Sequence, residues 1–173
     1  MKPNISPLHV LDFAITAMDF SIVSSQNEEE DLTSYFQKYE IDIDFTLSKD
    51  QFLTVYIKTE INRSEEKLPG YTLMAEAACI FKFDEEAGLP DNIQQNLEGF
   101  STIYIALNSL RGLISNFTAN GPFGRYILPS IDLNDLIEKK KALLKVEKDN
   151  SELKEEKKRN PKKTKKSGTN KNK

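Results

Sequence analysis

The side chains that could perform chemistry are few and are not arranged for catalysis. The 173-residue chain has one histidine, His9, one cysteine, Cys79, and no tryptophan. His9 has no acid, serine or cysteine partner adjacent in the sequence, so its position does not indicate a general base. Cys79 lies in the middle of a run of small residues, where a buried, unreactive thiol is expected. A lone cysteine forms no internal disulfide, which suits a reducing compartment.

Acidic and glycine-containing segments do not match a known site either. Asp42 with Asp44, and the acidic run 28–31, could bind a cation, but both lack the glycine-punctuated loop of a calcium site. Residues 121–125 contain two glycines and an arginine, but no Gly-Lys-Ser/Thr follows as in a phosphate loop. The sequence therefore predicts a protein that is not an enzyme and that has no catalytic residues, no metal site and no cofactor.

Apolar side chains, in contrast, exceed what one core of this size needs. Each could pack in the core or in a subunit interface, but as a group they favour binding of other molecules through apolar surface. The candidates are Phe20, Ile22, Leu32, Tyr35, Phe36, Phe52, Tyr56, Phe123, Tyr126 and Leu136.

Four strands are predicted to position these side chains. In residues 39–47, apolar and acidic residues alternate, which indicates one buried and one solvated face. The other strands are predicted at 8–23, 53–61 and 71–83, the last with small residues on the face that a helix would cross. The connection 24–38 is longer than a hairpin needs, so a crossover loop or a short helix is expected.

The first strand alternates imperfectly. Simple alternation places Phe13 and Ile15 on one face, and Met18, Phe20 and Ile22 on the other. Both faces are therefore apolar at its end, which implies cover on both sides or an exposed patch.

Two helices are predicted after the strands. Apolar residues recur every three or four positions from Phe100 to Phe117, and Gly121 with Pro122 ends that helix. A rigid connector then leads to Asp132, which can cap a second helix. We expect an α+β fold, with a four-stranded antiparallel sheet, a long crossover after the first strand, and two helices.

A second stripe on the first helix consists of small and polar residues. Gly112 costs about 1 kcal/mol relative to alanine inside a helix. Close approach of another helix would compensate for this cost, whereas a solvated face with an accidental glycine would not. Both interpretations remain open for the stripe, which comprises Asn108, Gly112, Ser115 and Ala119.

Charge divides the chain into an acidic body and a basic tail. Residues 1–138 contain 9 basic and 22 acidic side chains, a net of 9 - 22 = -13, and residues 139–173 contain 15 and 5, a net of +10, in agreement with the total of -3. We predict a domain over 1–148 and a disordered lysine-rich tail over 149–173. The tail is either solubilising or an electrostatic arm for RNA, ribosome or anionic lipid.

Hydropathy predicts a cytoplasmic location without membrane insertion. The rather apolar segment 8–23 is interrupted by Asp12 and Asp19, which disrupt a signal-peptide core. No stretch approaches the roughly 20 uninterrupted apolar residues of a membrane span.

Four segments follow one another at a characteristic spacing: 108–117 (NSLRGLISNF), 121–123 (GPF), 128–129 (LP) and 132–136 (DLNDL). In order and spacing they resemble the C-terminal half of the SecB family of bacterial protein-export chaperones. With the strands upstream, the resemblance covers roughly residues 14–138.

Membership in this family would imply an ATP-independent holdase. Such chaperones bind unfolded polypeptides, including secretory precursors, in hydrophobic grooves and keep them competent for export and translocation. The resemblance also implies a homotetramer built as a dimer of dimers, in which first strands pair across one interface. First helices would be sandwiched between sheets, which gives the stripe at Gly112 a role in helix–helix contact between subunits.

Departures from the family pattern leave alternatives open. Asp19 and Glu76 are candidates for docking the translocase motor, but Val23 stands where a further acid is usual, and Glu76 is displaced. One alternative is a SecB-like chaperone dedicated to the antitoxin of a toxin–antitoxin pair. Another, of a different class, is an RNA- or ribosome-associated adaptor that acts through the basic tail, since the acidic body should repel nucleic acid.

Overall fold

A computed structural model describes residues 1–25 and 32–159 of the chain. Two compact units are distinguished: the first is Met1–Leu133, and the second begins at Asn134. Within the described residues, no helix is long and apolar enough to span a membrane, and no group of three or more His, Cys, Asp or Glu side chains could hold a metal ion.

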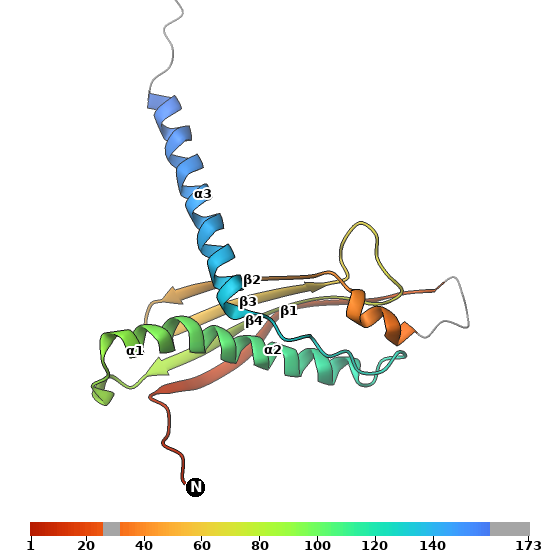
Figure 1. Ribbon diagram of the computed structural model, residues 1–173, viewed down its shortest axis with the longest axis horizontal. Coiled ribbons are helices and arrows are strands. Elements are labelled where there is room, and N and C mark those ends of the chain that lie inside the picture. The colour runs from red at the N-terminus through yellow and green to blue at the C-terminus, as the bar shows by residue number, and fades with distance from the viewer. Residues whose placement is uncertain (26–31, 160–173) are drawn as a thin grey trace, which may run out of the picture. The chain divides into compact units, whose positions relative to one another are not determined.

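The first unit is built on a four-stranded antiparallel sheet with the order β1-β4-β3-β2 (Figure 1). A long crossover after the first strand places β2 at the edge opposite β1, and it contains the 3₁₀ helix η1, Leu32–Lys38. The predicted fold class is confirmed. The strands are β1 Leu8–Val23, β2 Ile41–Lys49, β3 Leu53–Ile61 and β4 Gly70–Phe83.

Helical structure begins earlier than the sequence pattern indicated. After the short 3₁₀ helix η2, Glu85–Ala87, the chain forms α1 Asp91–Asn96, the π-helical turn η3 Leu97–Ser101 and α2 Thr102–Thr118. A π turn inserts one residue into the helical period. The apolar spacing of α2 therefore does not continue upstream, which is why the predicted helix began at Phe100.

Helix α3 runs from Leu133, the last residue of the first unit, to Arg159, so a helix starts directly after Asp132 as expected. The expected boundary at residues 148/149 lies inside this helix, and the division into a domain and a tail stays a prediction. The remainder of the predicted tail, 160–173, lies outside the described residues.

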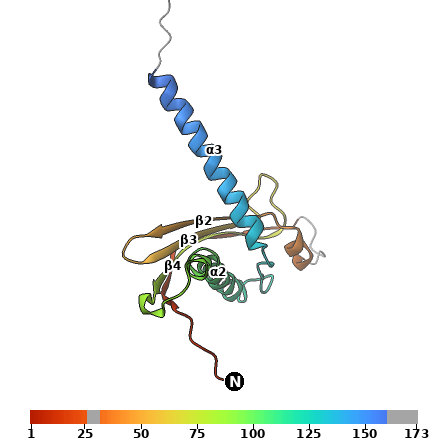
Figure 2. The same cartoon turned by 60° about the vertical axis from the view of Figure 1, so that its left-hand side comes forward.

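Helix α2 covers one face of the sheet (Figure 2). Beneath it, β4 presents Ala75, Ala77 and Cys79, which are at most 1% exposed, and α2 contributes the fully buried Leu110 and Ile114. Small side chains on the strand let the helix lie close to the sheet. Desolvation by burial, with a smaller contribution from the charge of Asp12, raises the pKa of the Cys79 thiol to about 11.

Two bulges in β1 correct the predicted assignment of its faces. Register shifts against β4 occur between Val10 and Asp12 and between Ile15 and Ala17. A bulge adds one residue to one strand and so reverses the alternation of everything that follows. As a result, one face of β1, the face covered by α2, carries Leu8, Val10, Phe13, Ile15, Met18, Phe20 and Ile22.

This face of β1 is incompletely covered. Val10, Ile15 and Ile22 are 49%, 48% and 47% exposed, and Phe117 on α2 is 45% exposed. We call Val10, Ile15 and Ile22 the β1 strip. Apolar surface of this kind on an edge strand is typical of contact with another chain.

Burial of Cys79 predicts that its thiol does not react with thiol reagents in the native protein. Because the folded-state pKa lies above the unfolded value, this group stabilises the fold below the unfolded pKa, and the contribution is lost as pH rises through about 11. At pH 8, Ellman's reagent should react with Cys79 in 6 M guanidinium chloride and not in buffer on the same timescale. Rapid reaction in buffer would contradict the buried position.

Candidate functional site

Seven aromatic rings gather at the end of the sheet where η1 and the connector after α2 meet. They come from β1, η1, the two-residue link between η1 and β2, β4, α2 and the connector (residues 121–129), and the paired ring centroids lie 5.0–5.6 Å apart. Tilted and edge-on pairs at such distances are favourable beyond the area that they bury. We call this group the aromatic cluster: Phe20, Phe36, Tyr39, Tyr71, Phe117, Phe123 and Tyr126.

Tyr71 ties the connector to the sheet. Its hydroxyl donates a hydrogen bond to the carbonyl of Gly124 at 2.9 Å and accepts one from the N–H of Phe123 at 3.0 Å. A Cβ atom added at Gly121 would lie 2.4 Å from this hydroxyl oxygen. Glycine at position 121 therefore leaves the space in which the tyrosine hydroxyl reaches the backbone.

Tyr39 holds the start of β4 in a similar way. Its hydroxyl donates to the carbonyl of Pro69 and accepts from the N–H of Tyr71, both at 2.9 Å. Gly70, between them, has φ +111°, and a Cβ atom there would lie 2.0 Å from the Tyr39 hydroxyl oxygen. This position therefore excludes a side chain both by its conformation and by the available space.

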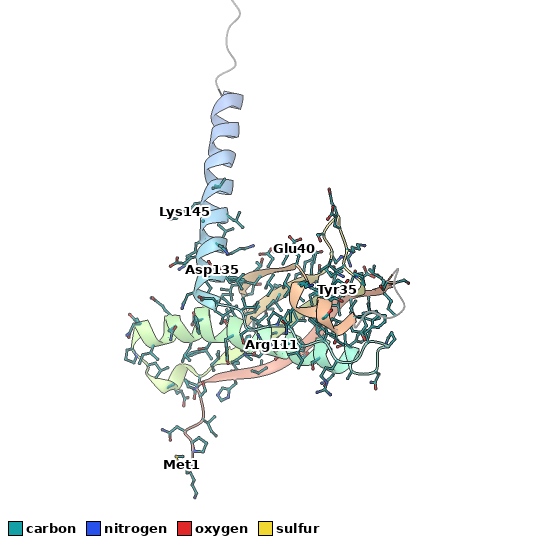
Figure 3. The ribbon with its side chains drawn as sticks, turned by 45° about the vertical axis from the view of Figure 1, so that its right-hand side comes forward. Met1, Tyr35, Glu40, Arg111, Asp135 and Lys145 are labelled. Carbon is teal, nitrogen blue, oxygen red and sulfur yellow. The ribbon has the colours of Figure 1, made fainter. Side chains whose placement is uncertain are left out.

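Helix α2 binds the connector at two further points. Thr118 Oγ1 accepts a hydrogen bond from the N–H of Tyr126 at 2.9 Å. Arg111, labelled on α2 in Figure 3, donates from Nε to the Leu128 carbonyl and from Nη2 to the Pro129 carbonyl, both at 2.9 Å. The connector is thus fixed along its length, and Tyr126 is held in the cluster.

Four predicted binding residues, Phe20, Phe36, Phe123 and Tyr126, meet in the aromatic cluster. Ile22 lies opposite Tyr71 in the sheet register. Leu32 and Tyr35 are half-buried on η1, with the Lys38 ammonium 5.3 Å from the centroid of the Tyr35 ring.

Three other candidates lie elsewhere. Tyr56 pairs with Thr46 and Ala78 on the opposite face of the sheet and is 49% exposed. Phe52 lies in the β2–β3 turn, at the other end of the sheet, where it lines a pocket of about 460 Å³. Leu136 belongs to the second unit.

A salt bridge closes one side of the pocket at Phe52. Lys49 Nζ lies 2.8 Å from Oε2 of Glu98, which is placed by the π turn η3. Hydrogen bonding from Lys49, and then from Gln94, lowers the pKa of the Glu98 carboxyl group.

Sequence reasoning missed three members of the aromatic cluster. Tyr39 and Tyr71 were assigned to alternating strand patterns, and Phe117 to the apolar stripe of a helix. The signal that could have identified the tyrosines is the pair Pro69-Gly70, since a glycine next to a tyrosine leaves room for a ring from elsewhere in the chain.

The predicted assembly stripe faces away from the sheet. Gly112 is exposed, and a Cβ atom there would meet nothing within 4 Å. Ser115 and Ala119 are half-buried, and Asn108 donates to the Tyr104 carbonyl and accepts from Arg111. Contacts among the described residues therefore do not explain the glycine.

Both predicted docking carboxylates lie on the uncovered face of the sheet and are paired. Asp19 bonds to Arg63, and Glu76 lies 3.7 Å from Lys58. Partly exposed pairs of this kind contribute little to stability, so a basic partner could exchange with either cation.

Comparison with known proteins shows the fold. No family model and no curated protein matches the sequence. The SecB-like chaperone Rv1957 of Mycobacterium tuberculosis, solved in complex with a ChAD peptide from the Rv1956 HigA1 antitoxin, matches with a TM-score of 0.51 at 10% identity, over 72% of this chain and 91% of that one. The chain therefore has a SecB-like fold. A protein of unknown function from Streptococcus agalactiae matches with a TM-score of 0.32 at 11% identity, over 72% of this chain and 97% of that one.

Substitution of Gly70 tests the anchor formed by the Tyr39 hydroxyl, which binds the main chain on both sides of Gly70. Gly70→Ala forces a left-handed backbone on alanine and a clash with Tyr39, so the free energy of unfolding should fall by about 2–4 kcal/mol in urea titrations. Gly88→Ala is the matched control, because φ is also positive (+56°) but a Cβ atom meets nothing within 4 Å. Its cost should be about 1 kcal/mol, from the backbone alone. Equal losses for the two variants would contradict the anchor.

Proposed function

We propose that this protein is an ATP-independent holdase chaperone that binds non-native polypeptides, secretory precursors among them, and keeps them competent for export. The observation that carries this proposal is the aromatic cluster, assembled next to exposed apolar surface on a SecB-like fold. No catalytic step and no cofactor form part of it, and the proposed location is the cytoplasm.

Affinity would come from many weak apolar contacts. Phe117 of the cluster is 45% exposed, Ile22 beside it is 47% exposed, and Tyr35 is half-buried on η1. Burial of such side chains against an extended chain is favourable and non-directional, so it needs no particular client sequence. Several such contacts along one path add up to useful affinity.

We further propose a homotetramer, assembled as a dimer of dimers. The β1 strip offers apolar surface on a long edge strand, and the stripe of Asn108, Gly112, Ser115 and Ala119 offers small side chains on the outer face of α2. An edge strand pairs readily with an edge strand of another chain, and small residues allow helices to approach closely. Docking of the translocase motor at Asp19 and Glu76 is a separate proposal.

The antitoxin-dedicated alternative has one observation in its favour. The Mycobacterium tuberculosis chaperone of similar fold was solved with a peptide from an antitoxin. A client of this chain would then be one antitoxin rather than many precursors. Specific binding of an antitoxin encoded beside this protein, with no protection of unrelated clients, would favour this alternative over the general holdase.

Aggregation of a model client tests the holdase function directly. The full chain should suppress light scattering by reduced insulin at stoichiometric ratios and without nucleotide. Deletion of residues 157–173 should leave the suppression intact, because the acidic body carries the apolar surface. Absence of suppression, combined with salt-sensitive RNA binding that is lost in the deletion, would instead establish the adaptor function.

Gly112→Leu tests the assembly. Because a Cβ atom at this position would meet none of the described residues within 4 Å, the variant should keep the subunit fold and gain about 1 kcal/mol of helix propensity. The bulky side chain should nevertheless block helix–helix contact and reduce the molar mass measured by light scattering. Gln95→Leu, at an exposed position of α1, should leave the molar mass unchanged. An intact tetramer in Gly112→Leu would refute the role of the stripe.

A further inference from the structure

Tyr126 differs from the two other tyrosines of the aromatic cluster. Tyr126 is 2% exposed, and its hydroxyl has no hydrogen-bond partner among the residues that the structure describes, whereas the hydroxyls of Tyr39 and Tyr71 each have two. Burial raises the pKa of Tyr126, and the neighbouring Tyr39 raises it further, so the group stays protonated and can donate. An unpaired buried hydroxyl destabilises a fold, and phenylalanine would fill the same space without that cost. The hydroxyl therefore needs an explanation outside the free protein.

Phe36 is the member of the aromatic cluster that η1 contributes, and it is half-buried. It packs edge-on against Tyr126 with centroids 5.4 Å apart, and it also contacts Tyr39 and Tyr71 at 5.6 and 5.5 Å. Its own helix, η1, has no buried residue. The three tyrosines, in contrast, are held by backbone hydrogen bonds to β4, to the connector or to α2.

From this arrangement we propose that Phe36 occupies, in the free protein, the place of a client side chain. When a client displaces it, the Tyr126 hydroxyl donates a hydrogen bond to a main-chain carbonyl of that client. This inference rests on the proposed binding of non-native polypeptides. It specifies that a client side chain replaces Phe36 and that the Tyr126 hydroxyl binds the client backbone.

The free energy lost when Phe36 leaves the cluster would be offset by the contacts that the client side chain makes in its place. An apolar client side chain would regain the ring contacts that Phe36 gives up, while the new hydrogen bond exists only in the complex. A main-chain carbonyl is present at every residue of every client, so recognition by Tyr126 does not depend on client sequence. Self-occupation by Phe36 also lowers the apparent affinity, because only the displaced fraction of the protein can bind.

Tyr126→Phe should move stability and affinity in opposite directions. Removal of the unpaired hydroxyl should raise the Tm of the free protein. The Kd for fluorescently labelled, reduced and carboxymethylated α-lactalbumin should increase about three- to ten-fold, the loss of one hydrogen bond. Tyr71→Phe is the matched control: its hydroxyl is already paired within the chain, so this variant should lower the Tm. A Tyr126→Phe protein with lower Tm, or with unchanged Kd, would overturn the inference.

Phe36→Ala tests whether Phe36 is displaced by the client or is a permanent part of the binding surface. With the occupant removed, the same probe should bind about three- to ten-fold more tightly. If Phe36 were instead a permanent part of the binding surface, its loss would weaken binding and refute the inference. Gln37→Ala, at an exposed position of the same helix, should leave the Kd unchanged. A wild-type protein that does not bind the probe would contradict the proposed function, and this inference with it.

Discussion

Two hydrogen bonds to the hydroxyl of Tyr71 determine much of this structure. They join the first residue after Gly70 in β4 to the connector 52 and 53 residues further along the chain. The main-chain N–H of the same residue is bound by the Tyr39 hydroxyl, which also holds Pro69. Crossover, strand and connector therefore converge on one side chain. Gly70 and Gly121 are required because each leaves space for a tyrosine hydroxyl close to the backbone.

This constraint fixes the tyrosine rings of the aromatic cluster through hydrogen bonds to main-chain groups. Phe36 packs on these rings from η1, a helix without a buried residue. A site for non-native chains needs fixed apolar surface for affinity and some freedom to fit different side chains. The proposed exchange at Phe36 would meet both needs without an energy source such as ATP.

Apolar surface is also concentrated by the geometry of β1. Two bulges bring seven apolar side chains to one face of a strand whose simple alternation would divide them between two faces. Part of this surface, the β1 strip, is left uncovered by α2. Assembly and client binding would therefore draw on adjacent parts of the same face, and this proximity gives an oligomer a direct influence on how much of the site is accessible.

The sequence by itself determined three strands and helix α2 with its end near Gly121, because strand alternation, helical period and helix-terminating residues are local properties. The three strands were predicted at 39–47, 53–61 and 71–83. The sequence also indicated the SecB-like fold and four members of the aromatic cluster. Tertiary structure alone decided the face assignment of β1, since a bulge exists only relative to the register of β4. The same holds for the meeting of Tyr39, Tyr71 and Tyr126, which depends on hydrogen bonds and ring contacts between residues 32 to 87 positions apart. The only local trace of it that we identify in the sequence is the pair Pro69-Gly70 before Tyr71.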